Sequence, residues 1–379
     1  MPSASDTVTA RPGRGSTALK AVGLLLLVAA VVSFPSLAAD PFILSVGVVI
    51  MSYAVLATSW NFVGGFTGYI SLGHAAYSGL GAYATGLLVI HTGTNPWLAM
   101  LLAGVVVALI AIPIGIASLR VRGASFVIVS IAMVLILLLV FQSWGSVTGG
   151  SNGLRVPRPF DPSVLRPEQH ERFFYLHAAL LAVALLAWWA IDRSRFGMGL
   201  KAIREDEDKA QSLGVPTFSY KLVAFVVSAF FTALGGGLYA LWFGFLDPIF
   251  QFSILVGSYM VLMSLLGGIR SLFGPLLGAV IVGYAVEYFK SQYGDTQFHL
   301  VAMGLLLGAV VLFMPDGIIP ALTQLVRRFR PQAASIREVS QADLAEQRRA
   351  AADGSEGSTA DPGAAAAGAG DRETEGVKR

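Results

Sequence analysis

The chain of 379 residues contains no cysteine and few charged residues. Without cysteine it has no disulfide framework, no thiolate metal site and no cysteine nucleophile. Charged residues make up 13% of the chain, against 55% hydrophobic residues, and the mean hydropathy is +0.68. A water-soluble domain of this size could hardly cover so much apolar material with polar surface, so the composition indicates an integral membrane protein.

Sequence patterns for catalysis are also missing. The chain has no G-x-x-x-x-G-K-[ST] phosphate loop, so it cannot bind and hydrolyse ATP by that route. The five histidines are scattered, and they form neither a metal-ligand cluster nor a nucleophile with its base. Few acidic residues lie within hydrophobic runs, and Glu287 is the main one. We therefore expect no enzyme activity, no metal site and no cofactor bound by this chain. The net charge of +3 comes from flanks and loops and does not indicate nucleic acid.

Apolar runs near the ~20 residues needed to cross a bilayer recur along the chain. They predict an all-α, polytopic helical bundle with about ten transmembrane helices, or eight at the lower limit. The runs are residues 18–38, 43–61, 69–90, 96–119, 123–142, 173–191, 222–245, 249–267, 272–289 and 297–314.

The first run follows three positive charges and ends near Ser36-Leu37-Ala38, which resembles a signal-peptidase site. A cleaved signal is one alternative, but the length of the run and the second run directly after it favour a membrane span. With the N-terminus inside, most positively charged loops lie in the cytoplasm, as the positive-inside rule requires. Both termini are then cytoplasmic. The exception is the outer loop, residues 143–172, which carries four arginines.

The chain divides into three parts. Residues 1–17 form a cytoplasmic N-terminal segment, residues 18–320 the transmembrane domain, and residues 321–379 a cytoplasmic tail. The tail begins with arginines suited to lipid headgroups and then becomes rich in alanine, glycine, glutamate and arginine. We expect it to be disordered, with a short helix at residues 335–351 as the alternative.

Residues 60–86 read WNFVGGFTGYISLGHAAYSGLGAYATG, with small residues where a membrane protein usually has leucine. Small residues let two backbones approach closely, so this stretch indicates a packed interface between helices. Pairs of small residues four apart could let helices slide past each other, or could serve static packing. These pairs are Gly64-x-x-x-Gly68, Ala82-x-x-x-Gly86, Gly274-x-x-x-Gly278 and Gly304-x-x-x-Gly308.

Part of the same stretch, residues 61–71, combines glycines with polar side chains at membrane depth. One interpretation is a broken helix whose backbone groups line a water-filled path, and the other is an ordinary cytoplasmic turn. His74 could form a hydrogen bond in the path or, alternatively, with a neighbouring helix. The candidate residues for a translocation path are Asn61, Gly64, Gly65, Gly68, Ser71, Gly73 and His74.

The large cytoplasmic loop, residues 192–221, predicts a short amphipathic helix over residues 198–213. One face carries apolar residues at helical spacing: Leu200, Ile203, Ala210 and Leu213. Charged residues lie largely off this face, among them Arg204, Glu205 and Asp208. Gly214 lies where a helix often ends in the left-handed conformation. The apolar face needs a partner, which is either the membrane surface and the ends of the chain's own helices, or another protein.

Several segments resemble the membrane permease subunits of bacterial branched-chain amino acid ABC transporters, and specifically the larger, M-type subunit. They extend over residues 40–320 in the expected order. The segments are Asn61 with Gly64-Gly65, GYISLGHAAYSGLGAY from Gly68, TGGSNGL from Thr148, AIREDEDKAQSLGV from Ala202, YKLVAFVVSAFFTALGGGLYA from Tyr220 and FMPDGI from Phe313.

This resemblance implies an importer in the bacterial cytoplasmic membrane, surrounded by lipid. In such importers an external substrate-binding protein delivers the amino acid, a second, H-type permease subunit completes the pathway, and two cytoplasmic ABC ATPase subunits use ATP. Branched-chain amino acids are the expected substrates, although related permeases carry urea, short amides or other amino acids. An ion-coupled secondary transporter is the alternative mechanism, but it would normally show a buried carboxylate or a sodium-ligating break in each half.

The resemblance also assigns roles to two loops. Residues 202–215 are similar to the coupling loop of ABC permeases, whose helix docks on the ATPase, although two of the four positions that define its pattern differ here. The coupling candidates are Leu200, Ile203, Arg204, Glu205, Asp208, Ala210, Leu213 and Gly214. TGGSNGL is similar to an outer-side motif that could meet the binding protein or shape the pore mouth, or be a glycine-rich turn. Its residues are Thr148, Gly149, Gly150, Ser151, Asn152 and Gly153.

Overall fold

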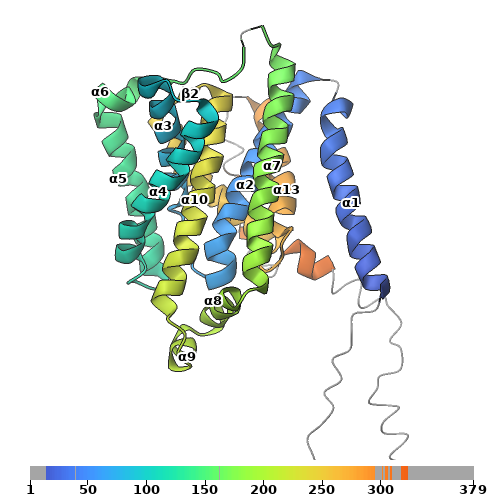
Figure 1. Cartoon of the computed structure of the whole chain (residues 1–379), viewed down its shortest axis with the longest axis vertical. Helices are drawn as coiled ribbons and strands as arrows, with labels where there is room; N and C mark the ends of the chain where they lie inside the picture. The colour runs from blue at the N-terminus through green and yellow to red at the C-terminus, as the bar shows by residue number, and fades with distance from the viewer. Residues whose placement is uncertain are drawn as a thin grey trace, which may run out of the picture. The chain divides into compact units, whose positions relative to one another are not determined.

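The chain folds into a bundle of helices, shown in Figure 1. The structure is a computed structural model that describes residues 14–38, 40–161, 163–294, 301, 304, 305, 308, 309 and 317–322. The helices are α1 (Arg14–Leu37), α2 (Pro41–Thr67), α3 (His74–Thr92), α4 (Pro96–Ser118), α5 (Ala124–Ser143), α6 (Gly145–Thr148), the 3-10 helix η1 (Gly150–Asn152), α7 (Arg166–Arg193), α8 (Arg195–Glu205), α9 (Glu207–Ser212), α10 (Thr217–Phe243), α11 (Pro248–Gln251), α12 (Ile254–Gly267) and α13 (Gly274–Tyr293). Two short strands, β1 (Leu154–Arg155) and β2 (Phe245–Leu246), pair antiparallel. The predicted all-α class is confirmed for the described residues.

Six helices in the described residues are long and apolar enough to cross a bilayer. They are α2, α4, α5, α7, α10 and the stretch Pro248–Gly267, which contains α11 and α12, and they coincide with six predicted runs. Three further runs coincide with α1, α3 and α13, which are helical but are not among the six. Most of the last run, residues 297–314, lies outside the described residues, as do the N-terminal segment to residue 13 and the tail from residue 323.

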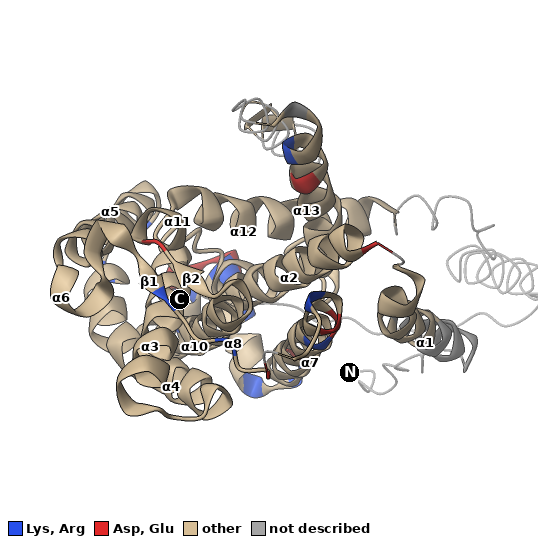
Figure 2. Ribbon diagram, turned by 90° about the horizontal axis from the view of Figure 1, so that it is seen from above, with Lys and Arg blue, Asp and Glu red and all other residues tan. Residues whose placement is uncertain are grey.

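Helices α2 and α10 form the centre of the bundle. In their most apolar windows 61% and 67% of the residues are buried, compared with 17% in α5. Helix α10 packs against α2, α3 and α4, whereas α2 also packs against α7, α12 and α13. Figure 2 accordingly shows the two helices between α4 on one side and α12 and α13 on the other. We call the two ends of the bundle the α8–α9 end and the β1–β2 end, after the elements found there (Figure 1).

Helices α3 and α10 meet backbone to backbone. A Cβ atom at Gly236 of α10 would lie 2.0 Å from the carbonyl oxygen of Ser78 in α3. A Cβ atom at Gly81 of α3 would lie 2.2 Å from the carbonyl oxygen of Ala233. Distances this short cannot be tolerated, so the close approach of the two helices requires glycine at both positions. This contact agrees with the packed interface that the small residues of residues 60–86 predict.

The pairs of small residues four apart have different environments. A Cβ atom at Gly274 would lie 2.0 Å from the carbonyl oxygen of Gly268. A Cβ atom at Gly278 would lie 1.7 Å from that of Met263. The space beside Gly64 is filled by the ring of Trp60 on its own helix. At Gly304 and Gly308 no described atom comes within 4 Å of such a Cβ. The pair Gly274 and Gly278 therefore packs α13 closely against the α12 segment. Sliding of helices past each other at these pairs stays a prediction.

Replacing Gly236 by alanine tests the contact between α3 and α10. The added methyl group must push the two backbones apart, and overpacking of this kind costs about 1–3 kcal/mol. We expect Gly236→Ala to lower the Tm of the detergent-solubilised protein, measured by intrinsic fluorescence. The matched control is Gly145→Ala, because a Cβ atom there meets no described atom within 4 Å. Equal Tm values for both variants would contradict the close contact.

Candidate functional site

The connection between α7 and α10 forms two helices rather than one. We expected a single helix over residues 198–213, but the chain is extended at Asp206, where φ is −164° and ψ is 107°. The Asp206 carboxylate accepts a hydrogen bond from the backbone N–H of Lys209 at 3.0 Å. Aspartate favours such an N-cap position because its side chain satisfies an N–H that has no partner within the helix. The single-helix prediction was therefore wrong, and Asp206 begins α9 as a separate helix.

The end of α9 follows the sequence prediction. Gly214 has a φ of 86°, in the left-handed region that favours glycine. The N–H of Val215 donates to the carbonyl oxygen of Ala210 at 3.1 Å, and the N–H of Gly214 donates to that of Gln211 at 3.0 Å. This pair of bonds is the Schellman arrangement, which satisfies carbonyl groups at a helix end. The predicted helix stop at Gly214 is confirmed.

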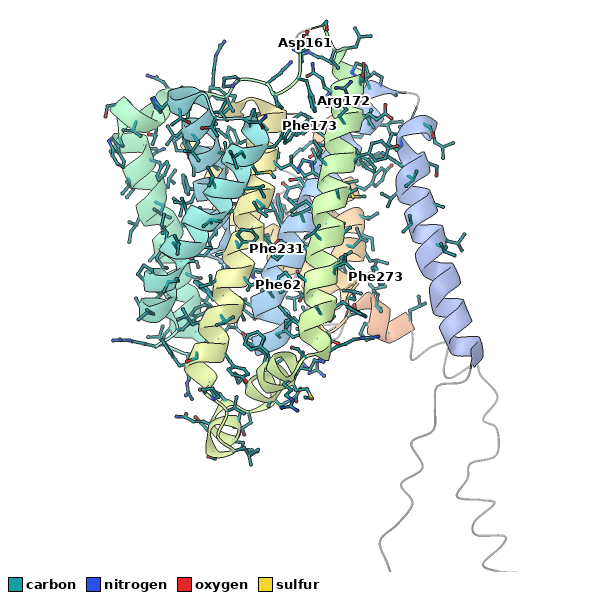
Figure 3. The ribbon with its side chains drawn as sticks, in the orientation of Figure 1. Phe62, Asp161, Arg172, Phe173, Phe231 and Phe273 are labelled. Carbon is teal, nitrogen blue, oxygen red and sulfur yellow. The ribbon has the colours of Figure 1, made fainter. Side chains whose placement is uncertain are left out.

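The predicted apolar face is divided between two environments. Leu200, Ile203 and Ala210 are at most 3% exposed, and they pack against aromatic side chains of the bundle. These include Phe62 of α2 and Phe231 of α10, whose stacked rings lie 5.4 Å apart between centroids (Figure 3). Leu213 is 84% exposed, so its predicted place on the same face was wrong. The physical reason is the end of the helix: α9 ends at Ser212, so Leu213 is the C-cap residue outside the helical face to which Ala210 belongs.

A buried ion pair joins α9 to α10. Lys221 of α10 donates to Oε1 of Glu207 at 2.6 Å, and their side chains are 3% and 12% exposed. The Tyr69 hydroxyl donates to Oε2 of Glu207 at 2.7 Å and accepts a bond from Lys221 at 2.9 Å. Tyr69 belongs to the segment between α2 and α3, residues 68–73. The three side chains thus connect α9, α10 and the chain before α3 in one closed set of hydrogen bonds.

Two arginines add bonds between the α8–α9 connection and other segments, and one of them, Arg122, extends this network. Arg122, from the turn before α5, lies 3.3 Å from Glu207 and donates to Asp208 at 2.8 Å. Arg204 of α8 donates to the carbonyl oxygen of Gly65, near the end of α2, at 2.7 Å. Side chains of this network border a cavity of about 410 Å³ between α8, α9 and the segments before α3 and α5. The α8–α9 connection is therefore bonded to α2, α10 and the segments before α3 and α5.

The ionisation of Glu207 and Tyr69 fits these hydrogen bonds. Burial alone raises the pKa of Glu207, but the hydrogen bonds from Lys221 and Tyr69 and the nearby positive charges outweigh it, so the pKa falls below its ordinary value. Burial and the bond to Glu207 raise the pKa of Tyr69. At neutral pH the carboxylate is charged and the phenol keeps the proton that it donates.

The segment predicted as a broken helix or a turn fits neither description. Helix α2 continues without a break to Thr67, and Gly68, with a φ of 76°, ends it. The non-helical residues 68–73 then return into the bundle rather than staying at its end. The Trp60 indole N–H donates to the carbonyl oxygen of Ser71 at 2.7 Å, and the N–H of Leu72 donates to the Ser130 hydroxyl at 3.2 Å. Trp60 lies seven residues before the end of α2, about 10 Å along the helix axis.

His74 forms a hydrogen bond with a neighbouring helix, the second of the two alternatives. Its Nε2 atom lies 2.7 Å from the hydroxyl of Ser228 in α10. The same hydroxyl donates to the carbonyl oxygen of Ser59 in α2 at 2.6 Å, so Nε2 of His74 must be the donor in the first bond. Of the other path candidates, Gly68 is exposed, whereas the remaining five are buried within the chain: Asn61, Gly64, Gly65, Ser71 and Gly73. The amide of Asn61 has no hydrogen-bond partner among the described residues.

The TGGSNGL segment forms a turn at the β1–β2 end. Three of its glycines have positive φ values, of 77°, 58° and 74°, at Gly149, Gly150 and Gly153. Thr148 is buried, and its hydroxyl donates to the carbonyl oxygen of Phe141 at 2.6 Å. Ser151 and Asn152 are exposed. The segment thus has the geometry of a glycine-rich turn that presents two polar side chains, and contact with a binding protein stays a prediction.

Sequence analysis missed the members of the network that lie far apart along the chain. Lys221 and Arg122 were counted only as loop charges, and Tyr69 was not singled out. The available signal was a lysine at the start of an apolar helix, which needs an anionic partner if it is buried. The sequence could not show which carboxylate of the α8–α9 connection is that partner, nor that Tyr69, 152 residues from Lys221, joins the pair.

Comparison with known proteins gives one matching family model, described as branched-chain amino acid transport system / permease component, which covers residues 42–314. The high-affinity branched-chain amino acid transport system permease protein LivM of Salmonella typhimurium is 27% identical over 81% of this chain and 76% of its own length. The corresponding protein LivH of Escherichia coli is 29% identical over 71% of this chain and 91% of its own length. The nucleoside ABC transporter permease protein NupC of Lactococcus lactis is 22% identical over 66% of this chain and 87% of its own length.

Removing the carboxylate of Glu207 tests the buried ion pair. In Glu207→Gln the ammonium group of Lys221 stays buried without a charged partner, which costs about 3–5 kcal/mol. We expect a clearly lower free energy of unfolding, measured by denaturant titration in detergent. The control is Asp208→Asn. The Asp208 side chain, which pairs with Arg122, is 80% exposed, so this substitution should lower the free energy of unfolding by at most about 1 kcal/mol. Similar losses in the two variants would contradict the role of burial.

The same pair predicts a dependence of stability on pH. Because folding lowers the pKa of Glu207 below the ordinary 4.5, the unfolded chain takes up this proton first as the pH falls. The stabilisation is complete above the ordinary pKa and is lost as the pH falls through the folded value. We therefore expect the difference in stability between the natural protein and Glu207→Gln to be constant at neutral pH and to narrow below about pH 4.5. A difference that does not change from pH 7 to pH 3 would contradict this assignment.

Proposed function

We propose that this chain, which belongs to the family of branched-chain amino acid transport system permease components, is a membrane subunit of an ATP-driven importer of branched-chain amino acids. The observation that carries the proposal is the family match over residues 42–314. The relatives named LivM and LivH, which match most of this chain, support the same function. The six apolar helices suit a multi-pass protein of the bacterial cytoplasmic membrane.

The importer needs partners, because this chain contains no phosphate loop. A second, H-type permease subunit completes the pathway, and two cytoplasmic ABC ATPase subunits bind and hydrolyse ATP. An external binding protein delivers the substrate. The chain itself is then a transport subunit that binds no cofactor, and alternating access follows from movements of the ATPase subunits.

The proposed topology has about ten crossings with both termini in the cytoplasm. It places the α8–α9 end in the cytoplasm and the β1–β2 end outside. In support, the α8–α9 connection and the turn before α5 contain much of the positive charge of the loops, as the positive-inside rule requires. The TGGSNGL turn then faces the binding protein, and the loop arginines at residues 155–172 are the exception to the rule.

The α8–α9 connection is the proposed docking element for the ATPase. Its inner face, Leu200, Ile203 and Ala210, is buried against the bundle and anchors the element to this chain. Its outer side carries Leu213, which is 84% exposed, and Lys209, whose side chain is 82% exposed. An apolar side chain presented on a charged surface gains stability in a partner's groove. Movement of α9 then reaches α10, α3 and α5 through the network around Glu207.

Of the path candidates, three lie in α2, three in the segment between α2 and α3, and His74 begins α3. In the proposed cycle they are packing and hydrogen-bonding residues whose arrangement changes when α10 moves. His74, Ser228 and Ser59 hold α3, α10 and α2 together in the state described here.

Transport measurements test the function. The chain is expressed with its chromosomal neighbours and reconstituted in proteoliposomes with the cognate binding protein. We expect ATP-dependent uptake of radiolabelled leucine, isoleucine and valine, and no effect of ionophores that collapse ion gradients. Uptake of urea, acetamide or uridine instead of amino acids would change the substrate class. Uridine is included because the relative NupC is a nucleoside ABC transporter permease protein. Uptake that needs an ion gradient and not ATP would contradict the ABC mechanism.

Replacing Leu213 by serine tests the docking element. Loss of a buried leucine contact is worth about 1.5–3 kcal/mol, so association with the ATPase should weaken roughly tenfold or more. The measurement is co-purification of the ATPase at a series of concentrations. Leu165→Ser is the matched control, because Leu165 is 72% exposed and precedes α7 at the other end of the bundle. Equal retention of the ATPase by both variants would remove Leu213 from the interface.

A further inference from the structure

We propose that a cavity between α2, α3 and the chain from α10 to α13 is a contact site for the transported amino acid. In this site Glu287 binds the ammonium group of the substrate and Lys290 binds its carboxylate. The proposal rests on the proposed function and goes beyond it, because it names the residues and the chemical class that they recognise. We call this cavity the α13 cavity.

The α13 cavity has a volume of about 130 Å³ and a lining that is partly polar. The polar lining groups come from α2, α10, α11 and α13, and they include Ser52, Tyr53, Tyr239, Gln251, Glu287 and Lys290. Ser52 and Gln251 are buried, at 4% and 8% exposure. Within the described residues, the side chains of Ser52, Tyr53, Tyr239 and Gln251 donate and accept no hydrogen bond. Unpaired polar groups inside a membrane protein are costly unless water or a ligand satisfies them.

Glu287 and Lys290 add two opposite charges to this cavity. The ammonium group of Lys290 donates to Oε1 of Glu287 at 2.9 Å. Glu287 lies 13 residues from the start of α13, which corresponds to about 20 Å along the helix axis. Six residues, about 9 Å along the axis, separate Glu287 from Tyr293, the last residue of α13. Charged side chains on an apolar helix of a membrane protein face a water-filled path or another protein rather than lipid.

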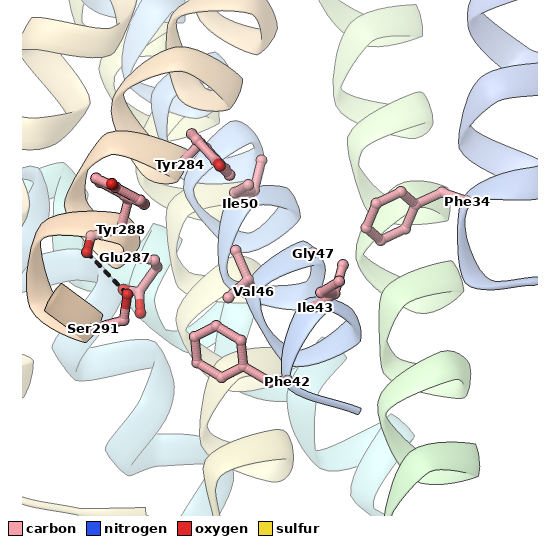
Figure 4. A pocket seen from close by; sticks show the side chains of 10 residues that line it. All are labelled: Phe34, Phe42, Ile43, Val46, Gly47, Ile50, Tyr284, Glu287, Tyr288 and Ser291. Atoms are coloured by element: carbon pink, nitrogen blue, oxygen red, sulfur yellow. Dashed lines mark hydrogen bonds between the residues drawn. The ribbon is translucent and has the colours of Figure 1, made fainter. Parts of the chain in front are cut away.

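Glu287 also borders a second cavity, of about 290 Å³, on the side of α13 that faces α2 (Figure 4). The second cavity is lined mainly by apolar and aromatic side chains, such as Phe42, Ile43 and Val46 of α2 and Tyr284 of α13. Glu287 is the residue that the linings of both cavities share. A ligand in either space would meet this carboxylate, which is 19% exposed.

The chemistry of the α13 cavity favours a zwitterion with an apolar side chain. A free amino acid carries one ammonium and one carboxylate group on the same carbon atom, and the lining offers one charge of each sign on adjacent turns of α13. The hydroxyl groups of Tyr53 and Tyr239 and the amide of Gln251 can bind either group. Val49, Leu56 and Val256 supply an apolar wall for the side chain of the substrate. Urea, short amides and nucleosides carry no such pair of charges, so this lining favours amino acids among the cargoes of related permeases.

The cavity opens on the surface of this chain rather than being enclosed. Lys290 and Phe250 stand at its edge, with exposures of 44% for the lysine side chain and 73% for the phenylalanine. A surface with a charged pair on an apolar helix suits contact with a second permease subunit. The α13 cavity is then one half of a contact site that the partner subunit completes.

The first test is the isosteric variant Glu287→Gln in the complete transporter, with its partner subunits and binding protein, in proteoliposomes. The amide keeps the size of the side chain but loses the negative charge that binds the ammonium group. We expect kcat/KM for radiolabelled leucine to fall at least tenfold, while the Tm and the amount of co-purified ATPase stay unchanged. Glu168→Gln is the charge control, because Glu168 is exposed and paired with Arg172 on the surface. Leucine uptake by Glu287→Gln equal to that of the natural transporter would overturn the proposal.

Tyrosine variants provide a second, independent test of the proposed site. Tyr239→Phe removes a hydroxyl group from the α13 cavity, whereas Tyr284→Phe removes one from the second cavity only. We expect Tyr239→Phe to raise the KM for leucine at least threefold and Tyr284→Phe to leave it within twofold of the natural value. The reverse order of effects would place the substrate in the second cavity and contradict the proposed site.

A charge swap separates substrate recognition from a structural ion pair. The double variant Glu287→Lys with Lys290→Glu keeps the pair but exchanges the two charges. If the pair only stabilises α13, the swap should restore the uptake that Glu287→Gln loses, and this result would overturn the proposal. If the two charges orient the substrate, uptake should stay at least tenfold reduced in a transporter that assembles normally.

The same measurements distinguish the site from the function on which it rests. A natural transporter that imports none of leucine, isoleucine and valine overturns the proposed function, and the site with it. A natural transporter that imports them, together with a fully active Glu287→Gln variant, overturns the site alone.

Discussion

The buried ion pair between Lys221 and Glu207 is the interaction on which the α8–α9 end depends. The side chain of Lys221, in the first turns of the central helix α10, is 3% exposed, so its ammonium group requires an anion within reach. Glu207 can supply that anion only because α9 begins at this residue, directly after the Asp206 cap. A shift of α9 by one residue would turn the carboxylate away from Lys221. The position and register of α9 are thus fixed by the charge of the helix that follows it.

The connections of α9 determine how a displacement spreads through the bundle. Glu207 also binds Tyr69, before α3, and Arg122, before α5, so three segments meet at one carboxylate. Helix α3 is tied to α10 a second time, by the contact of Gly236 with the backbone of α3. With backbones this close and a hydrogen bond from His74 to Ser228, α3 and α10 should move as one body rather than slide past each other. Movement of α9 therefore reaches a unit of helices and not a single one.

The sequence predicted the features that depend on local pattern. The apolar runs gave six spanning helices at the right places, and Gly214 predicted the end of α9, because both depend on residues close together in the chain. It could not predict the break at Asp206, since the residues on both sides favour a helix and the cap competes with its continuation. The exposed position of Leu213, the C-cap residue after α9, was missed as well. Nor could it predict the partners of Lys221 or the α13 cavity, which bring together residues up to 238 positions apart, from Ser52 of α2 to Lys290 of α13.

Helix α10 connects the two polar regions of the chain. Lys221 binds α9 near one end of the helix, and Tyr239 borders the α13 cavity 18 residues further on, about 27 Å along the axis. The three glycines between them, residues 235–237, would allow a bend in an isolated helix. Here Val55, Ser78 and Thr85 of α2 and α3 occupy the space that a side chain would need at these positions, and α10 is continuous from Thr217 to Phe243. Helix α10 is therefore one continuous connection between the two regions, and we expect a displacement imposed at Lys221 to change the position of Tyr239 relative to Glu287 of α13.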